Sequence, residues 1–375
     1  MKTGFIKKKV MYDLLIIGGG ISGMVAAITA KRRGKSVIVL EKNDKIGKKL
    51  LATGNGKCNM ANVSDIEGKY NTDYVYPILR EYPLKKQLDF YKSIGLLTKE
   101  VEGRIYPYSE QASSVLNALR EELYNLGVQI VVSSEIKTIH NGYEVLGYKA
   151  KNVLLATGSR ASFGTESGYL YEKFGHRNSE LRPALVPVIT SVENLKGLRG
   201  VRVKAKVKLF IDNRYVAECY DEVIFKDNGV SGTAVFNLSQ KIARSKGTKA
   251  RFTLDLMPEY TFDECLKIIK ELGGIEGIFH KEIVNNVLRT AGKELGKIVE
   301  KIKCYPLENV RLGSVELAQV MSGGLNVNDF NQYTLESKLS KGLYASGEVL
   351  DVDGECGGYN IMWAVASGMA VGENV

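Results

Sequence analysis

The sequence lacks several patterns that would place it in a special class. No apolar run reaches the roughly eighteen residues of a membrane-spanning helix. Cysteine is scarce: the five thiols have no Cys-x-x-Cys spacing, and their odd number argues against a fully paired disulfide framework. The basic residues 1–10 lead directly into a predicted strand, which is not the layout of a signal peptide. We therefore expect a protein of the reducing cytoplasm that has no membrane partner.

Repeats and low-complexity linkers are also lacking, so the 375 residues are expected to fold as two or three ordinary globular domains. Hydrophobic residues make up 44% of the chain and charged residues 25%, which is enough to bury a substantial core. The formal charge of +10 is spread along the chain rather than gathered in a tail. We interpret it first as a contribution to solubility and second as a sign of an anionic partner.

The N-terminal region contains a β-α-β pattern of about thirty residues. Residues 12–17 form a short apolar strand that ends in three glycines. Residues 21–33 follow with helical spacing, and residues 36–40 form a second strand that ends at Glu41. This order of strand, glycine turn, helix and strand is typical of a nucleotide-binding domain.

The same pattern carries a dinucleotide-binding fingerprint at Gly18, Gly20 and Gly23. Gly18 permits the tight turn, Gly20 lets the backbone approach a pyrophosphate at the helix N-terminus, and Gly23 lets helix and strand pack closely. Glu41 follows Gly23 by eighteen residues and is placed to accept hydrogen bonds from ribose hydroxyls. An acid there disfavours a 2′-phosphorylated ribose. The fingerprint alone cannot separate FAD from NAD.

The rest of the chain predicts an α/β domain, and its pattern of apolar and polar residues changes near residue 191. Residues 83–126 have a helical pattern, and strands are predicted at residues 128–133, 142–146 and 153–156. From residue 201 to 212 apolar residues alternate with polar ones, which predicts the start of a β-rich insert. The remaining predicted elements are a helical stretch at 261–303, a strand at 342–345, a glycine- and acid-rich loop at 347–358 and a helix at 359–371.

Two later motifs favour FAD over NAD. The strand at 153–156 ends in Ala156-Thr157-Gly158, a strand exit that resembles the second nucleotide-contact motif of two-dinucleotide-binding flavoproteins. Residues 343–348 resemble their third motif, in which the acid after the glycine, here Glu348, reaches the ribityl chain or the pyrophosphate. Three motifs in this order, each on a suitable element, predict FAD.

Longer stretches resemble a known family. Residues 48–59, 347–354 and 357–360 are similar to the aminoacetone-oxidase-like family of FAD-binding flavoproteins, which also includes flavoproteins implicated in bile-acid dehydroxylation. The resemblance implies an FAD-binding Rossmann-type domain of the two-dinucleotide-binding kind, made of residues 1–190 and 322–375. It also implies an interrupting β-barrel-like insert. That insert spans residues 191–321, with a β-rich part at 191–258 and a small helical subdomain at 259–305.

The resemblance further implies where the cofactor binds. The loop at 53–59 is expected to lie against the isoalloxazine, and the final helix to aim its N-terminus at flavin N1 and O2, where it would stabilise the negative charge of reduced flavin. Thr233, Met321 and Cys356 depart from the family pattern, and the last two flank segments expected near the ring. The residues expected to bind FAD are Gly18, Gly20, Ile21, Ser22, Gly23, Glu41, Lys42, Lys49, Thr53, Gly54, Gly56, Asn59, Ile136, Ala156, Thr157, Gly158, Gly347, Glu348, Gly358, Tyr359, Asn360 and Ile361.

These features predict an FAD-dependent oxidoreductase that acts on a small molecule, either by oxidising an amine or by reducing an activated carbon–carbon double bond. Arg104 and Tyr106, in a glycine-flanked turn, are candidate substrate contacts. No catalytic acid or base and no metal site is predicted. The chain has no second glycine fingerprint, because residues 273–277 lack a preceding strand. NAD(P)H or oxygen would therefore meet the flavin directly.

The alternative hypothesis is an FAD-containing RNA-binding or tRNA-modifying protein. The positive charge and a two-motif likeness to tRNA-modifying flavoproteins suggest it. Against it, the basic row from Arg202 to Lys208 has no interleaved aromatic residues for base stacking, and such a row is usually the solvated side of a barrel strand. Cys58 and Cys356 are interpreted as packing or incidental thiols, and His176, after Gly175, as a helix-end cap rather than a base.

Overall fold

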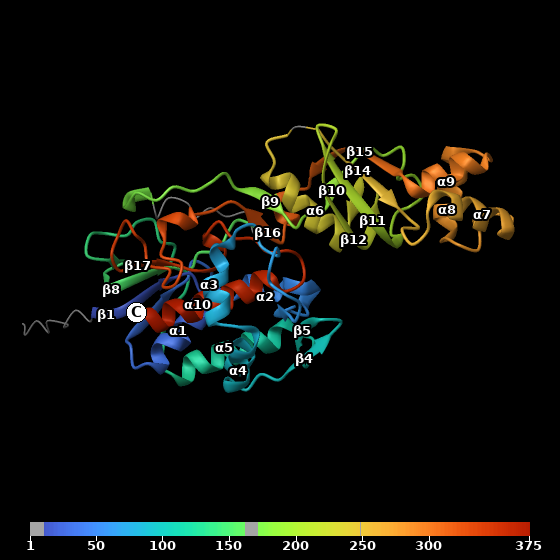
Figure 1. Ribbon diagram of the computed structural model, residues 1–375. Helices are drawn as coiled ribbons and strands as arrows, with labels where there is room; N and C mark the ends of the chain where they lie inside the picture. Colours follow the sequence, from blue (N-terminus) through green and yellow to red (C-terminus); the bar gives the residue numbers. More distant parts are fainter. Residues whose placement is uncertain (1–10, 162–171, 248) are drawn as a thin grey trace, which may run out of the picture. The chain divides into compact units, whose positions relative to one another are not determined.

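The computed structural model describes residues 11–161, 172–247 and 249–375 and contains two compact units (Figure 1). The basic segment 1–10 lies outside the described residues. The first unit comprises residues 1–160, 165–181 and 323–375, and the second comprises residues 161–164 and 182–322. The second unit thus takes in β9 (Arg182–Ala184), which precedes residue 191, because β9 pairs with β16 (Val320–Ser322).

The first unit is built on a parallel sheet of five strands in the order β17-β8-β1-β2-β6. Its central strands are nearly continuous apolar runs buried on both faces, which is typical of parallel sheets. The register aligns Ile17 with Leu40 and Leu155, and Leu155 with Ala345, so four strands end at one edge. The strands are β1 (Met11–Ile17), β2 (Val37–Leu40), β6 (Gln129–Val131), β8 (Tyr148–Leu155), with β7 (Glu144–Val145) antiparallel to it, and β17 (Leu343–Ala345).

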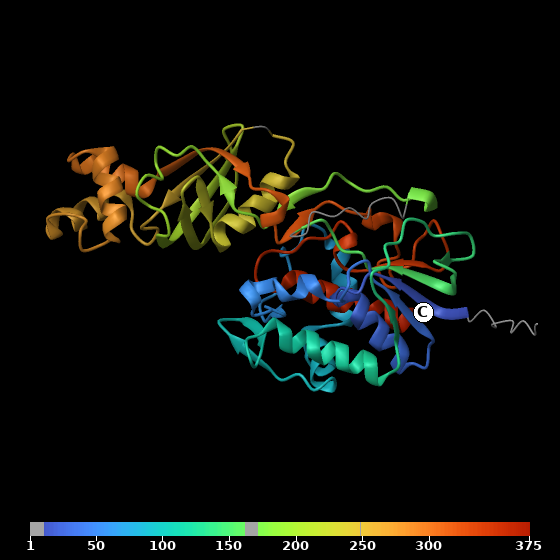
Figure 2. The same ribbon diagram turned by 180° about the vertical axis from the view of Figure 1, so that it is seen from behind.

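Helices α1 (Ile21–Arg32) and α10 (Tyr359–Asn374) pack against each other in this unit (Figures 1 and 2). Two glycines of α10 permit close approach, because a β-carbon on Gly368 would lie 2.5 Å from the Ser22 carbonyl oxygen and one on Gly372 would lie 2.8 Å from that of Ala26. Both contacts advance by four residues along each helix, so the helices are parallel. At the usual rise per residue, α10 begins about 12 Å before α1 does.

A small antiparallel sheet interrupts the helical region predicted for residues 83–126. The middle of that prediction is wrong, because β4 (Thr98–Val101) and β5 (Arg104–Pro107) form a hairpin between α4 (Leu84–Ser93) and α5 (Ala112–Asn125). Glu102 and Gly103, both left-handed, make its two-residue turn. β3 (Ala61–Asn62) completes the sheet in the order β3-β5-β4. Two further short helices are α2 (Lys48–Leu51) and α3 (Tyr76–Glu81).

The second unit contains a closed six-stranded barrel, and a helical piece is inserted in the chain between its strands β14 and β15. Its β11 alternates buried apolar residues with outward basic ones, as predicted. Gly273 is the left-handed cap that ends α7, so residues 273–277 are a helix end and not a nucleotide loop. The elements are β10 (Val188–Ile189), β11 (Arg202–Ile211), β12 (Arg214–Lys226), β13 (Gly229–Ser231), β14 (Ala250–Asp255), β15 (Tyr305–Leu312), α6 (Thr233–Arg244), α7 (Phe262–Leu272), α8 (Lys281–Ala291) and α9 (Leu295–Lys303). The predicted α/β class with a Rossmann sheet, a barrel and a helical piece is confirmed.

Candidate functional site

The loops that leave the parallel sheet meet at its carboxyl edge. Gly18 follows β1, Glu41 follows β2, Ala156 follows β8 and Ser346 follows β17. Ligands of open parallel sheets bind outside this edge. The fold therefore brings the three predicted nucleotide motifs together, although they are far apart in the sequence.

The glycine fingerprint forms a tight turn with open space in front of α1. Gly18 has a φ of +109°, and a β-carbon there would lie 2.3 Å from the Ala156 carbonyl oxygen. A β-carbon on Gly23 would lie 2.2 Å from the Gly18 carbonyl oxygen, so helix and strand require glycine at both positions. A β-carbon on Gly20 would meet no atom within 4 Å, and no side chain caps the helix that follows. The first N–H groups of α1, from Ile21 onward, thus face space that suits a pyrophosphate.

Glu41 is buried and held in one orientation at this edge. Its Oε2 accepts from the Gly19 amide at 2.8 Å, and its Oε1 accepts from the Asn43 amide and side chain at 2.8 and 2.6 Å. The Glu41 carbonyl accepts from Ser134 at 2.8 Å, which brings the segment that contains buried Ile136 beside the acid. Lys42, the next residue, is exposed.

Lys49, Ser159 and Glu348 converge from three separate segments. Lys49 in α2 forms an ion pair with Glu348 Oε2, Ser159 donates to Glu348 Oε1 at 2.5 Å, and Lys49 Nζ lies 3.3 Å from Ser159 Oγ. Glu348 stands in the short 3-10 turn Gly347–Val349, where Gly347 approaches Ser22 of α1 closely. An unpaired carboxylate in this place would repel the phosphates of a dinucleotide, and Lys49 balances its charge.

The loop at 53–59 is a run of left-handed residues. Gly54, Asn55, Gly56 and Cys58 all have positive φ. The Thr53 hydroxyl is used within the loop, donating to the Leu50 carbonyl at 2.6 Å, so Thr53 stabilises the loop with its side chain rather than offering it to a ligand. The loop at 53–59 is therefore suited to contact a ligand through its backbone.

The N-terminus of α10 is positioned by the same region. A β-carbon on Gly358, whose φ is +103°, would lie 2.6 Å from the Ala61 carbonyl oxygen. The Asn360 side chain donates to and accepts from the backbone of Gly354, both at 2.9 Å, and Tyr359 is buried and accepts at its carbonyl from Tyr70 at 2.8 Å. The Asn360 side chain and the Tyr359 carbonyl are therefore used within the protein. What these two residues offer a ligand, with half-buried Ile361, is the first amides of the helix.

Asn62 is a positioning residue that the sequence did not predict. Its side-chain amide donates to the Gly357 carbonyl at 3.0 Å, which fastens β3 to the start of α10. Its closeness in sequence to the matched stretch 48–59 was the one available signal.

Three polar atoms lack a hydrogen-bond partner and indicate that this region fits FAD. Among the described residues, the buried atoms Thr157 Oγ1, Asn59 Oδ1 and Ser346 Oγ have none. Thr157 and Ser346 stand at the carboxyl edge, and Asn59 lies against Gly358 at the start of α10. Buried polar atoms are rarely left unpaired, so these three suit the polar groups of a dinucleotide. The staggered N-termini of α1 and α10 suit a phosphate and an electron-accepting ring respectively.

The candidate substrate residues lie on one face of the small sheet. Arg104 is in register with Asn62, and Tyr106 with Lys99, so these four side chains share a face. Because Asn62 is bonded to Gly357, this face lies beside the start of α10. Glu110 at one side binds Lys57 at 2.7 Å and Lys99 at 2.6 Å, and these two cations hold its pKa at about 2.

The remaining reactive side chains have structural surroundings. Burial raises the pKa of the Cys58 thiol to about 12, which disfavours a thiolate, and Cys356 is half-buried. The buried His176 ring stacks on Phe330 and hydrogen-bonds Ser337 at 2.8 Å, so it packs inside the unit. Across the described ranges, no group of side chains is arranged to hold a metal ion, and no helix has the length and apolarity to cross a membrane.

Comparisons with known proteins agree with this geometry. The family described as HI0933-like protein Rossmann domain matches residues 12–374. A 3-dehydro-bile acid delta(4,6)-reductase from Clostridium scindens is 33% identical, over 95% of this chain and 97% of its own. A ribosomal RNA dihydrouridine synthase from Haemophilus influenzae is 27% identical, over 95% and 96%. The 3-ketosteroid-delta4-(5alpha)-dehydrogenase of Rhodococcus jostii has a similar fold, with a TM-score of 0.52, 15% identity and coverage of 100% of this chain and 98% of that one.

Proposed function

The chain belongs to the HI0933-like family of Rossmann-domain proteins, and from this premise we propose that it reduces a carbon–carbon double bond activated by a neighbouring carbonyl group. The predicted FAD cofactor and the predicted class of FAD-dependent oxidoreductase are confirmed. The narrower resemblance to the aminoacetone-oxidase-like group stays a prediction. The relative from Clostridium scindens supports the proposal, since it is a delta(4,6)-reductase of a small molecule, a 3-dehydro-bile acid.

One observation favours double-bond reduction over amine oxidation. The sheet face beside the start of α10 carries Arg104 and Lys99, with Lys57 adjacent to Tyr106. These three cations outnumber the one carboxylate, Glu110, that pairs with Lys57 and Lys99. A positive face repels a protonated amine, whereas it stabilises the oxygen of a carbonyl whose conjugated double bond gains a hydride. We assign Arg104 to this oxygen and Tyr106 to the body of the substrate.

We propose that the residues predicted from the sequence hold FAD, and we assign their roles as follows. The amides at Gly20 and Ile21 bind the pyrophosphate, Glu41 the ribose, and the amides of Tyr359 to Ile361 the pyrimidine side of the ring. When bound, FAD supplies the hydride chemistry. The chain itself binds the substrate, orients it and stabilises charge at its carbonyl oxygen. We propose that NAD(P)H supplies the electrons at the open face of the ring, because the second unit is a barrel and not a nicotinamide domain; oxygen, the other expected partner, would only accept electrons from reduced flavin.

The test is anaerobic and follows the flavin absorbance. Enzyme reduced with dithionite is mixed with 2-cyclohexenone or with cyclohexanone, and oxidised enzyme is mixed with benzylamine. We expect reoxidation by the enone alone and no bleaching by the amine. Arg104→Gln should slow reoxidation at least about tenfold, the loss of one charge-assisted hydrogen bond, while Arg104→Lys keeps part of the rate. Arg202→Gln on the outer face of the barrel is the matched control. Rapid bleaching of the flavin by benzylamine would overturn the proposed double-bond reduction and favour amine oxidation instead.

A second candidate substrate is a uridine base in RNA. The ribosomal RNA dihydrouridine synthase relative supports it, as does the charge of residues 182–322, which contain 23 Lys and Arg against 17 Asp and Glu. The chemistry would be the same, since the double bond of uridine is also conjugated to a carbonyl. RNA binding that weakens steeply with salt supports this candidate, and no binding at low salt excludes it.

A further inference from the structure

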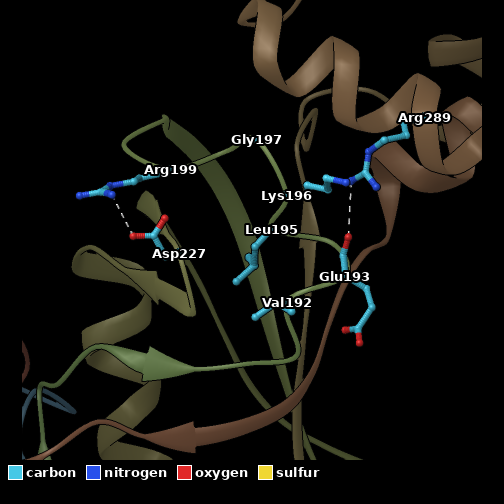
Figure 3. A pocket seen from close by; sticks show the side chains of 8 residues that line it. All are labelled: Val192, Glu193, Leu195, Lys196, Gly197, Arg199, Asp227 and Arg289. Atoms are coloured by element: carbon cyan, nitrogen blue, oxygen red, sulfur yellow. Dashed lines mark hydrogen bonds and ion pairs between the residues drawn. The ribbon is translucent and has the colours of Figure 1, made fainter.

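A separate cationic pocket lies in the second unit, where the turn at residues 192–199 meets α8 (Figure 3). Its volume is about 450 Å³, within the range of small-ligand sites. Lys196 and Arg199 come from the turn, and Arg289 comes from α8. None of these residues belongs to the unit that carries the Rossmann sheet.

One wall of the pocket is held in place by a buried polar network. Asn286 on α8 donates to the carbonyls of Asn194 and Lys196 at 3.1 and 2.9 Å. The Tyr305 hydroxyl donates to Asn286 Oδ1 at 2.6 Å, and Lys301 donates to Asn194 Oδ1 at 2.7 Å. A satisfied network of this kind fixes the backbone, so the pocket is preorganised rather than formed by loose side chains.

Two cations that line the pocket, Lys196 and Arg289, approach each other here without a carboxylate partner, and Lys301 lies near Arg289 without lining the pocket. Figure 3 shows Lys196 and Arg289 extending toward each other, while the Glu193 carboxylate points away from them. In the described part of the chain, Lys196, Arg289 and Lys301 form no ion pair, although Glu282 lies close to Gly197. Burial and the nearby charge of Arg289 lower the pKa of Lys301. Cations held together in this way repel one another and destabilise the folded protein, and a bound anion relieves this repulsion.

We propose that this pocket binds the phosphate group of a small phosphorylated ligand, such as a nucleoside monophosphate. A phosphate monoester carries nearly two charges and three strong acceptor oxygens at neutral pH, so it matches the two cations of the pocket better than a carboxylate does. Arg289 supplies a planar fork of donors and Lys196 a point charge, while Lys301, which donates to Asn194, adds positive charge near Arg289. The neighbouring Arg199 is already paired with Asp227 at 3.2 Å and lies outside the cluster. The site is independent of the proposed reaction.

The binding test uses the FAD-loaded protein and phosphorus NMR, so that it does not depend on activity. Inorganic phosphate and AMP are titrated separately, and the flavin absorbance of the filtrate checks that AMP does not displace FAD. We expect AMP to bind more tightly than phosphate. Arg289→Gln and Lys196→Gln should each weaken AMP binding about tenfold, as expected for one charged hydrogen bond, and Arg289→Lys should restore part of it.

Lys281→Gln is the matched control, because Lys281 is exposed on the same helix as Arg289 and does not line the pocket. It should leave AMP binding unchanged. Equal weakening by all three Gln variants would overturn the proposal in favour of diffuse surface charge. Failure of both phosphate and AMP to bind would also overturn it, as would binding only to a single-stranded RNA oligomer with equal affinity in all variants.

Discussion

Gly368 in α10 and Ser22 in α1 lie backbone against backbone, because a β-carbon at position 368 would come within 2.5 Å of the Ser22 carbonyl oxygen. This contact sets the spacing of the two helices whose N-termini form the proposed cofactor site. Gly368→Ala should therefore push α10 outward, lower the free energy of unfolding by about 1–3 kcal/mol and weaken FAD retention. Thermal unfolding and the flavin content of purified protein measure both effects.

The control for this prediction is Gly296→Ala in α9. No atom lies within 4 Å of a β-carbon at Gly296, and its backbone is helical. Alanine there should stabilise the protein by up to about 1 kcal/mol, since glycine disfavours a helix interior. A Gly368 variant as stable and as yellow as the Gly296 variant would contradict the assigned role of the helix contact.

The sheet and its nucleotide loops were predictable because their signals are local. The apolar runs of β1 and β2 are continuous, and Gly18, Gly20, Gly23 and Glu41 stand at fixed offsets from them. The β4–β5 hairpin was missed because β4, with the sequence Thr-Lys-Glu-Val, is short, polar and partly exposed, and carries no alternation. The available sequence signal was Gly103, because a two-residue hairpin turn needs the left-handed conformation that Glu102 and Gly103 adopt.

The parts of the site that sequence could not predict depend on distant partners. Asn62 acts on Gly357, which is 295 residues away, and Lys49 acts on Glu348, which is 299 residues away. Neither pair belongs to a periodic pattern, so only the folded chain brings them together. The cationic pocket formed by Lys196 and Arg289 is hidden for the same reason.

The Lys49–Glu348 pair predicts a coupled effect on FAD affinity. Lys49→Ala leaves the Glu348 carboxylate near the expected cofactor phosphates without its cation, so FAD should bind about tenfold more weakly. Glu348→Gln in addition should recover part of this loss, because the repulsive charge is removed. Equilibrium titration of apoprotein with FAD for both single variants and the double variant measures the coupling. Strictly additive losses would show that Lys49 acts independently of Glu348.

His176 predicts a loss of stability in mild acid. Burial lowers its pKa below the usual 6.5, although nearby Asp329 opposes the shift. The stability contributed by the neutral ring is therefore complete above pH 6.5 and is lost as the pH falls below that value, because the unfolded chain takes up the proton first. Thermal unfolding between about pH 7.5 and pH 5.5 should show this decline, which begins near the ordinary histidine pKa and continues below it.

His176→Gln should flatten that pH dependence, because the amide retains a hydrogen bond to Ser337 and does not titrate. His140→Gln serves as the control, since His140 is exposed in the same unit. A decline of equal size in wild type and in both variants would assign it to other groups.

Gly358 predicts a shift in the flavin reduction potential. The close approach of Gly358 to Ala61 keeps the N-terminus of α10 against the loop that contains Asn59, and any β-carbon there forces the two apart. Moving the positive end of a helix away from the ring removes about 1–2 kcal/mol of stabilisation from its reduced, negatively charged state. Gly358→Ala that still retains FAD should therefore have a two-electron potential lower by roughly 20–40 mV. Spectroelectrochemical titration against a reference dye measures it. Gly296→Ala is the control, because a β-carbon there meets no atom within 4 Å and Gly296 belongs to the second unit, away from the residues proposed to hold FAD, so the potential should not move. An unchanged potential in a yellow, folded Gly358→Ala protein would show that the α10 terminus does not act on the ring.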